Sequence, residues 1–402
     1  MQPHPAKRGV PGLGAALAEL DQAQLRRERL TVAGFPAPGE QVFTTGDGRA
    51  LVDFSSNDYL GLARHPALAR AMSECAAHMG AGSGASHLIT GHGAEHSQLE
   101  EELADFTGRE RALLFSTGYM ANLAVMSALA RRGQQVLLDR LSHASLIDGA
   151  RLAGAQLRRY GHADAHSAER LAAADPAHTA LIATDGVFSM DGDLAPVPQL
   201  ARAARAQHAW LVVDDAHGLG VIGPSGRGTL EHYGLSATEV PVLIGTLGKA
   251  FGSFGAFVAG AAELIEYLMQ KARSYIYTTA LPQPVAAASR AALALVRAEG
   301  WRRERLFAHV ARFRTLAQAA GVPLLNSATP IQPVLLGSAR AALAVQRELS
   351  EAGLCVMAIR PPTVPAGSAR LRVALSAAHT PEQIEELVTR LARACARERD
   401  AP

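Results

Sequence analysis

The sequence predicts an α/β protein in which a mostly parallel sheet is covered by helices on both faces. From about residue 94, segments with the apolar spacing of helices alternate with short, continuously apolar segments. Continuously apolar strands are typical of parallel sheets, because both faces of such a sheet are buried under helices. Beyond about residue 300 the pattern changes to long helices rich in Ala, Arg and Leu, which indicates a smaller α+β unit.

The predicted elements follow one another in a regular order. Helical periodicity covers 94–106 and stops at Gly108. The other predicted elements are strands at 112–115, 136–138, 179–183, 210–213 and 242–244, helices at 119–132 and 199–207, and strands at 331–336 and 371–375. Ligands bind at the carboxyl ends of the strands in such a sheet, so the polar residues that follow these segments are the candidates for function.

The length of the chain predicts more than one domain. A chain of 402 residues exceeds the size that one hydrophobic core usually supports. We assign residues 56–299 to a large domain that contains the parallel sheet and residues 300–402 to a small C-terminal domain. Residues 1–55 are expected to pack with the small domain.

Composition excludes several classes of function. The net charge is only +2 and the basic residues are scattered, so nothing indicates binding to nucleic acid or to a membrane surface. No apolar run reaches the ~18 residues of a membrane span, and the first 14 residues lack the apolar core of a signal peptide. The three cysteines are odd in number and show no metal spacing, which is typical of free thiols in a reducing compartment. We expect a cytoplasmic protein.

One lysine stands out because lysine is rare in this chain. Of the 39 basic residues only Lys7, Lys249 and Lys271 are lysines. Lys7 lies near the N-terminus, and Lys271 belongs to a helical stretch that we expect to be solvated. Lys249 lies among glycines, where solubility needs no charge, so a chemical role is the better explanation.

A glycine motif after the 210–213 strand could indicate nucleotide binding. Residues 218–223 (GLGVIG) match Gly-x-Gly-x-x-Gly. That motif requires a helix to begin at once, so that the helix N-terminus meets the pyrophosphate. Here residues 224–228 (PSGRG) follow, which do not form the first turns of a helix. We therefore favour a glycine-rich loop packed beside a site over a nicotinamide-dependent dehydrogenase.

A second motif could indicate zinc. Residues 92–96 match His-x-x-Glu-His, the inverted zinc-protease pattern. The two histidines would have to share a helical face, but the flanking Gly91 and Gly93 place His92 before the helix. No third ligand is evident, so we interpret both as polar residues at a helix start.

The polar residues that follow the predicted strands fit a lysine-bound pyridoxal phosphate (PLP). This cofactor needs an amine for a Schiff base, a carboxylate for its pyridinium nitrogen, a planar group on its ring and donors for its phosphate. Asp214 ends one strand, His217 follows it, and Lys249 follows the next strand. Asp215 is an alternative carboxylate, or a turn or cap residue.

Donors for a phosphate are also present. Thr117, Gly118 and Tyr119 join a strand to a helix whose N-terminal N–H groups can bind an anion. Thr246 precedes the lysine by three residues, and Ser189 lies in a polar loop, although either hydroxyl alone is more often a capping group. His143 follows a strand and could stack on a flat ring, although a loop histidine is more often a surface residue.

Five segments taken together resemble the α-oxoamine synthases. They are residues 56–62 (SNDYLGL), 142–145 (SHAS), 186–192 (GVFSMDG), 214–218 (DDAHG) and 245–249 (GTLGK). Members of this family are fold-type-I PLP enzymes that condense an amino acid with an acyl thioester and release CO₂. The resemblance runs from about residue 20 to residue 390, and it implies the same fold, cofactor and reaction type here.

The resemblance also implies roles for individual residues. It implies that Lys249 forms the Schiff base and takes the α-proton, that Asp214 pairs with the pyridinium and that His143 stacks on the ring. The resemblance places the remaining residues as follows: His217 at the cofactor phenolate oxygen; Gly118, Tyr119, Ser189 and Thr246 around the phosphate and ring; and Arg27, Asn57, Thr363 and Arg372 on the substrate side. Arg372 is expected to bind the substrate carboxylate. Arg26 and Arg29 are alternatives to Arg27.

Within the family, residues 359–365 (IRPPTVP) and 142–146 resemble the biotin-pathway branch. This implies L-alanine and a pimeloyl thioester, of CoA or of an acyl carrier protein, as substrates. It also implies a homodimer in which Thr278 or Thr279 reaches the phosphate in the neighbouring subunit. Leu219, Asp185 and Gln283 depart from many relatives, so a sister synthase that uses glycine stays an alternative. A non-catalytic subunit of the same fold is disfavoured by Lys249.

Overall fold

The computed structural model describes residues 12–36 and 39–400. Its largest feature is a seven-stranded sheet with the strand order β4-β10-β9-β8-β7-β5-β6. These strands are β4 (Arg111–Phe115), β5 (Gln135–Asp139), β6 (Gln156–Tyr160), β7 (Thr179–Asp185), β8 (Trp210–Asp214), β9 (Val242–Thr246) and β10 (Ala256–Gly260). All neighbours pair in parallel except β10, which is antiparallel to both β4 and β9. The expected α/β fold with a mostly parallel sheet is therefore confirmed.

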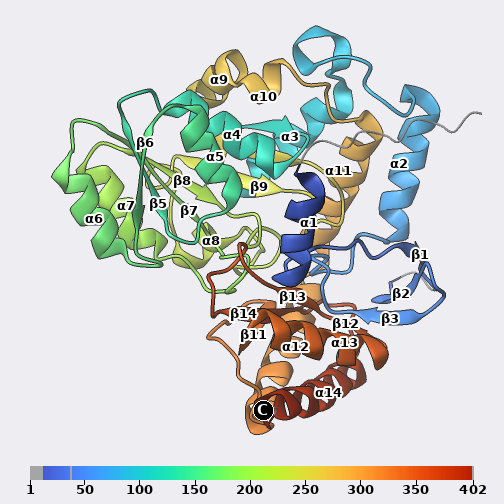
Figure 1. Ribbon diagram of the computed structural model, residues 1–402. Coiled ribbons are helices and arrows are strands. Elements are labelled where there is room, and N and C mark those ends of the chain that lie inside the picture. Colours follow the sequence, from blue (N-terminus) through green and yellow to red (C-terminus); the bar gives the residue numbers. More distant parts are fainter. Residues whose placement is uncertain (1–11, 37–38, 401–402) are drawn as a thin grey trace, which may run out of the picture.

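Helices cover both faces of this sheet (Figure 1). The helices of this half are α2 (Pro66–Met79), α3 (Ala94–Thr107), α4 (Gly118–Leu129), α5 (Ala144–Leu152), α6 (Ala165–Ala174), α7 (Val197–Ala206), α8 (Thr229–Tyr233), α9 (Ala262–Lys271), α10 (Arg273–Ile276) and α11 (Gln283–Ala298), with a π-helical turn η1 (His87–Gly91). Leu181 packs in a core cluster with α4, α5 and α9, whereas its neighbour Ile182 packs in a cluster with α6 and α7. Successive strand side chains point to opposite faces, so burial of both faces explains the continuously apolar runs.

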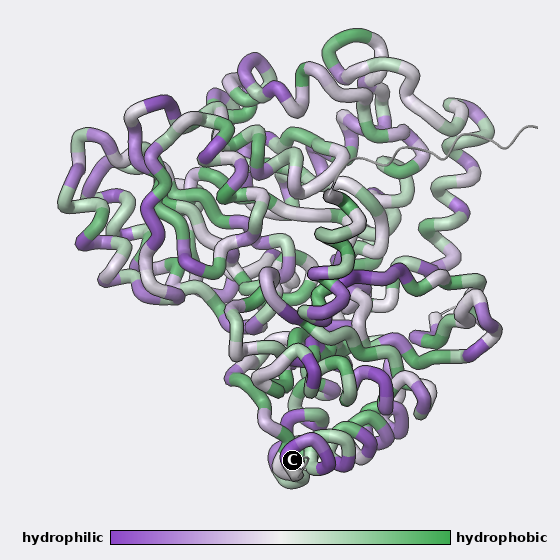
Figure 2. The backbone as a smooth tube through the Cα atoms, viewed as in Figure 1, coloured by the Kyte–Doolittle hydropathy of each residue, from purple (hydrophilic) through white to green (hydrophobic). Residues whose placement is uncertain are grey.

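The C-terminal part of the chain forms a smaller α+β layer (Figure 1). It contains a three-stranded antiparallel sheet with the order β11-β14-β13. The elements are α12 (Trp301–Ala319), β11 (Ile331–Gly337), α13 (Ala339–Glu351), β12 (Leu354–Cys355), β13 (Met357–Ile359), β14 (Ala369–Ala374) and α14 (Pro381–Asp400). Figure 2 shows the strands of the large sheet as mainly apolar, whereas α14 alternates between polar and apolar residues along its length, as a helix with one solvated face does.

The N-terminal segment joins this smaller layer. Strands β1 (Val32–Gly34), β2 (Val42–Thr45) and β3 (Ala50–Asp53) form a sheet with β12, which pairs in parallel with β3. A helix, α1 (Leu13–Gln22), precedes them. The contact between β3 and β12 agrees with the expected packing of the N-terminal segment, although the domain boundaries at 55 and 299 stay a prediction. Lys7 lies outside the described residues.

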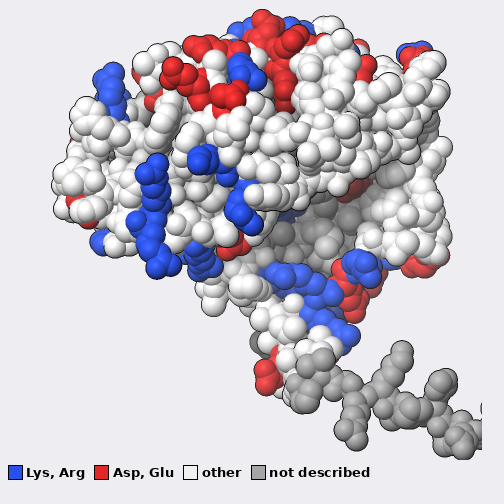
Figure 3. Space-filling view, turned by 90° about the horizontal axis from the view of Figure 1, so that it is seen from above, with Lys and Arg blue, Asp and Glu red and all other residues white. Residues whose placement is uncertain are grey.

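Charge is unevenly distributed on the face shown in Figure 3, where acidic side chains gather along one edge and basic side chains are spread over the rest.

Among residues 12–36 and 39–400, no helix combines the length and the apolar character that crossing a bilayer requires. The three cysteines are all free, as expected.

Candidate active site

The site lies at the carboxyl ends of β7, β8 and β9. Asp185 and Asp214 end adjacent parallel strands and are partners in the ladder, and Lys249 follows β9 by three residues. The parallel arrangement brings these ends to one edge of the sheet. Residues 35 positions apart in sequence thus share one environment, as the sequence predicts.

Lys249 is half-buried in this environment. Burial, opposed by the negative charge of Asp214 and reinforced by the positive charge of Arg372, lowers the pKa of its amine to about 8. Within the part of the chain that the structure describes, Lys249 Nζ makes no hydrogen bond or ion pair with another residue. At pH 7 about one tenth of such an amine is unprotonated, and this is the form that acts as a nucleophile or a base.

Asp214 is buried and held by two hydrogen bonds. Its Oδ2 accepts from Asn122 Nδ2 at 2.6 Å and its Oδ1 accepts from the Ala216 N–H at 3.1 Å. Asn122 also donates to Ser145 Oγ at 2.8 Å. The sequence interpretation missed Asn122, although a buried polar residue inside the otherwise apolar helix α4 was an available signal.

Asp185 is a second buried carboxyl beside Asp214. Burial and the neighbouring negative charge of Asp214 raise the pKa of Asp185 well above its usual range. Asp185 Oδ2 accepts a hydrogen bond from the His143 N–H at 3.0 Å. The residue was noted only as a departure from many relatives, and the structure adds that it fixes the backbone of His143.

Asp215 is directed away from this group. Its Oδ2 accepts from the Thr229 N–H at 2.7 Å, at the start of α8. Burial raises the pKa of its carboxyl to about 7. Its side chain packs where a Cβ at Gly218 or Gly228 would stand. Asp215 is therefore a capping and packing residue, one of the two alternatives that the sequence left open.

The same packing explains the glycine motif at 218–223. These residues form turns, and the next helix, α8, begins only at Thr229. Gly220 has φ of 83°, a left-handed conformation that favours glycine. The motif is thus a close-packed loop, as expected, and not the start of a nucleotide-binding helix.

The N-terminus of α4 and His143 border an open space. Thr117 caps α4 by accepting from the Met120 N–H, and a Cβ at Gly118 would meet no atom within 4 Å. His143 is exposed and lies edge-on to Tyr119, with ring centroids 6.5 Å apart. The exposed imidazole and the helix N-terminus offer a planar surface and anion donors at one place.

A polar network links the large sheet to β14. Tyr59 is fully buried, and its hydroxyl lies 2.7 Å from His217 Nδ1 and 3.3 Å from Arg372 Nη2. Arg372 also donates to Asn57 Oδ1 at 3.0 Å and to the Ser189 carbonyl at 2.6 Å. Burial and the positive charge of Lys249 hold the pKa of His217 well below its usual range, so the ring is neutral. Tyr59 was quoted within a motif but not recognised as the centre of this network.

One detail of β14 differs from the expectation. In the sequence, Leu371, Val373 and Leu375 alternate with Arg370, Arg372 and Ala374, which predicts one buried strand face and one that presents the arginines. In the structure all six residues of β14 are buried. The arginine face is covered because the turn after β7 packs on it, with Asp191 pairing with Arg370. Burial strengthens the case for function, because a buried guanidinium requires fixed acceptors.

Four predicted residues lie apart from this group. Arg27 donates to Thr363 Oγ1 at 3.2 Å, and both line a groove of about 570 Å³ that also contains Arg26 and Arg360. Thr278 and Thr279 follow α10, where Thr278 Oγ1 donates to the Ser274 carbonyl at 2.6 Å. In the described residues no hydrogen bond joins any of these four to Lys249 or Asp214. Thr246 Oγ1 donates to the Gly255 carbonyl at 3.0 Å, beside the lysine loop.

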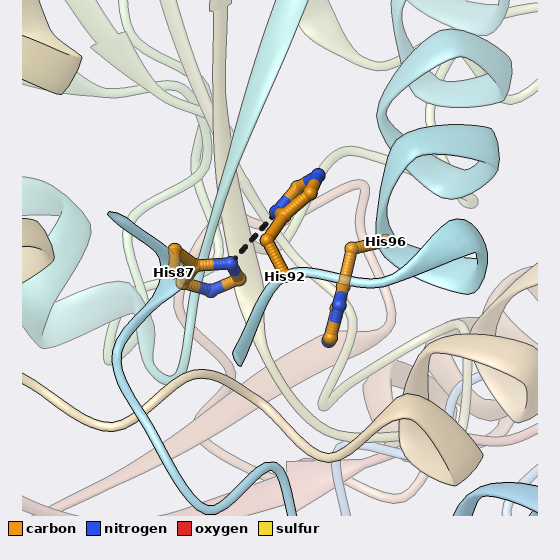
Figure 4. Close-up of side chains that lie close together, drawn as sticks. All are labelled: His87, His92 and His96. Atoms are coloured by element: carbon orange, nitrogen blue, oxygen red, sulfur yellow. Dashed lines mark hydrogen bonds between the residues drawn. The ribbon is translucent and has the colours of Figure 1, made fainter. Parts of the chain in front are cut away.

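Three histidines lie together at the N-terminal end of α3 (Figure 4). His92 precedes the helix, as expected, but the statement that no third ligand is evident is wrong, because His87 lies beside His92 and His96. His87 Nδ1 lies 2.9 Å from His92 Nδ1, and its ring stacks on Tyr275 at 5.0 Å. His96 accepts from the Gly93 N–H and donates to the Leu281 carbonyl, so both of its ring nitrogens are occupied. These bonds support the interpretation of His96 as a helix-start residue.

Comparison with known proteins agrees with this geometry. The family model "aminotransferase class I and II" matches residues 49–391. An 8-amino-7-oxononanoate synthase from Methylococcus capsulatus is 62% identical, over 88% of this chain and 91% of that protein. One from Halorhodospira halophila is 55% identical, over 99% of this chain and 98% of that protein. The chain belongs to the 8-amino-7-oxononanoate synthase family.

Solved structures support the same membership. A serine palmitoyltransferase variant from S. paucimobilis with bound PLP–myriocin aldimine matches with a TM-score of 0.90 and 30% identity, over 96% of this chain and 98% of that chain. An 8-amino-7-oxononanoate synthase from Francisella tularensis matches with a TM-score of 0.77 and 33% identity, over 87% and 99%. The chain is therefore a fold-type-I, PLP-dependent enzyme, and the expected cofactor class is confirmed.

The residues around Lys249 fit this cofactor. An amine with a lowered pKa, a buried carboxylate, an exposed imidazole and a helix N-terminus facing open space meet at one edge of the sheet. These are the four groups that lysine-bound PLP requires.

Proposed function

We propose that this member of the 8-amino-7-oxononanoate synthase family condenses L-alanine with a pimeloyl thioester in the biotin pathway. The reaction joins the alanine Cα to the acyl carbon, releases the thiol and CO₂, and yields 8-amino-7-oxononanoate. The observation that carries the proposal is the name shared by relatives at 55–62% identity over most of the chain. The grouping of Lys249, Asp214 and Arg372 supports it.

Lys249 is the proposed attachment residue and base. When bound, PLP forms a covalent bond with an amine and withdraws the electron pair left on carbon when a proton is lost. Lys249 Nζ would hold the cofactor, and the same atom, as a free amine, would take the alanine α-proton. A lysine of pKa ~10.4 would be a weak base at neutral pH, so the lowered pKa of about 8 supports this role.

The remaining residues bind and orient the cofactor. Asp214 would pair with the pyridinium nitrogen and His143 would stack on the ring. Neutral His217, whose Nδ1 contacts the Tyr59 hydroxyl, would hold the phenolate oxygen. The proposed phosphate donors are Gly118, Tyr119, Ser189 and Thr246. The open space beside Gly118 supports an anion there.

Arg372 is the proposed carboxylate site for alanine. A guanidinium binds a carboxylate through two parallel hydrogen bonds. The Ser189 carbonyl accepts from Arg372 Nε and Asn57 Oδ1 accepts from Arg372 Nη2, which supports a fixed orientation of the guanidinium. Arg27 and Thr363 are assigned to the acyl substrate, whose carrier is CoA or an acyl carrier protein.

The acyl chain is the sharpest test of the substrate. With saturating alanine, we expect kcat/KM for pimeloyl-CoA to exceed that for acetyl-CoA and succinyl-CoA by at least about 100-fold, because each lost methylene removes favourable burial. Glycine is expected to retain some activity, since one methyl group is distinguished by only ~1–3 kcal/mol. Initial rates with the three thioesters provide the measurement. Equal efficiency with acetyl-CoA or succinyl-CoA would point to a sister synthase.

A homodimer is the proposed assembly. Leu88 and Ile89 of η1 and Tyr277 after α10 are exposed, at 43%, 75% and 69%. Ser86 and Thr279 form a β-bridge, so these apolar side chains lie on adjoining segments. Neighbouring exposed apolar residues are typical of a protein contact, which supports a second copy of the chain beside Thr278 and Thr279.

Shared sites predict complementation between two inactive variants. Lys249→Ala and the double variant Thr278→Ala/Thr279→Ala should each be inactive alone. After mixing, unfolding and reassembly, about one quarter of the wild-type activity should return, because half of the dimers are mixed and each has one intact site of two. Assays with and without reassembly provide the measurement and its control. Mixed dimers that stay inactive would contradict the shared site.

A further inference from the structure

His162 bridges two acidic residues outside the site. It follows β6, and its Nδ1 lies 3.0 Å from Asp139 Oδ1, at the end of β5. Its Nε2 lies 2.9 Å from Asp193 Oδ2. Burial alone would favour the neutral ring, but hydrogen bonds to both carboxylates raise the pKa of His162 to about 10. Near neutral pH the ring is therefore protonated, and each of its nitrogens donates to a carboxylate.

Asp193 ends a closed turn that begins near Phe188. The Phe188 N–H donates to the Asp193 carbonyl at 3.0 Å, and the Gly192 N–H donates to the Phe188 carbonyl at 2.8 Å. The His162 ring also packs edge-on against Phe188, with centroids 4.4 Å apart. His162 therefore contacts both ends of the turn formed by residues 188–193.

The tip of the 188–193 turn binds the C-terminal layer. The Ser189 carbonyl accepts from Arg372 Nε at 2.6 Å, and Asp191 pairs with Arg370. The Gly192 carbonyl accepts from Ser327 Oγ at 2.8 Å and from Thr329 Oγ1 at 2.9 Å. The turn is thus the physical connection between His162 and Arg372.

We propose that His162 is a positioning residue for the substrate carboxylate, because it anchors the 188–193 turn whose Ser189 carbonyl orients the guanidinium of Arg372. The inference rests on the proposed function in one respect, namely that Arg372 binds the carboxylate of alanine. In the described residues the hydrogen bonds and ion pairs of His162 go to Asp139 and Asp193 and none goes to Lys249 or Asp214, so it acts on binding and not on proton transfer.

The test separates alanine binding from the chemical step. In His162→Gln we expect the KM for alanine to rise on the order of 10-fold, because a small misplacement of a binding group lowers efficiency by about one to two orders of magnitude. The dissociation constant for alanine, measured by spectral titration of the holoenzyme, should rise by the same factor. The kcat and the KM for pimeloyl-CoA should stay within about 3-fold. His166→Gln is the matched control, because His166 lies on α6 with its side chain 73% exposed and pairs with Glu169 at 3.6 Å, within the same helix.

Two further variants keep the result interpretable if His162→Gln is unstable. Asp193→Asn keeps a hydrogen-bond acceptor for His162 and should keep the alanine KM within about 3-fold of wild type, whereas Asp193→Ala should raise it on the order of 10-fold. Hydrogen exchange of the unliganded protein should be faster at residues 188–193 in Asp193→Ala than in Asp193→Asn. An unchanged alanine KM in both His162→Gln and Asp193→Ala would overturn the inference. Wild-type protein that does not use alanine would instead overturn the proposed function.

Discussion

Lys249→Ala is expected to lower turnover by at least about 10⁴-fold, because one substitution removes both the covalent attachment of the cofactor and the base for the α-proton. The fold should survive. Burial lowers the pKa of the Lys249 amine, so the charged amine costs stability in the native state and its removal is not destabilising. Initial rates with alanine and pimeloyl-CoA, together with Tm, are the measurements.

Lys271→Ala is the matched control. Lys271 ends α9 and is exposed, so its removal should leave turnover and Tm unchanged. Borohydride reduction of the holoenzyme followed by peptide mapping should place the pyridoxyl group on Lys249. A label on Lys271, or a Lys249→Ala protein with normal turnover, would contradict the assignment.

Several of the strands that the sequence predicted are buried on both faces. Residues 179–183 and 210–213 lie within β7 and β8, whose apolar runs reflect helices on either side. The strand β6 was missed because it lies at the sheet edge and reads QLRRY, with three of its five residues exposed. The strand β10 was missed because it follows a glycine-rich loop and pairs antiparallel, so no crossover helix announces it.

Helix ends were predicted less well than helix positions. The helix expected at 119–132 is α4, Gly118–Leu129. It stops earlier because Ala130 adopts an extended backbone conformation that leads into the turn before β5. Alanine and arginine are favourable helix formers, so local propensity gave no sign of this end.

Only those site residues that directly follow predicted strands could be placed near one another from the sequence. Asp214 and Lys249 follow adjacent strands, so their proximity follows from the topology of a parallel sheet. The contacts of Tyr59 with His217 and Arg372 span 158 and 313 residues, and no local pattern encodes them. The role of His162 likewise depends on its hydrogen bond with Asp193, which lies 31 residues further along the chain.

Asp214→Asn is expected to lower turnover on the order of 10³-fold, or about 4 kcal/mol in the activation free energy. An amide carries no negative charge, so it cannot keep the pyridinium nitrogen protonated, and the electron pair on the substrate carbon is no longer stabilised. Asp185 does not replace it, because burial and the charge beside it raise the pKa of Asp185 and favour its protonated form. Exchange of the alanine α-proton in D₂O, followed by NMR without thioester, should fall in parallel with turnover.

Asp215→Asn provides the comparison for this substitution. Asp215 is buried beside Asp214 in sequence but bonds to the Thr229 N–H, and an asparagine oxygen accepts the same bond. Its pKa of about 7 means that a neutral side chain is already tolerated there near neutral pH. We expect Asp215→Asn to keep its rate within about 3-fold of wild type. If Asp215→Asn were inactive while Asp214→Asn kept its rate, the pyridinium partner would be Asp215, and the geometry around Asn122 would have a purely structural meaning.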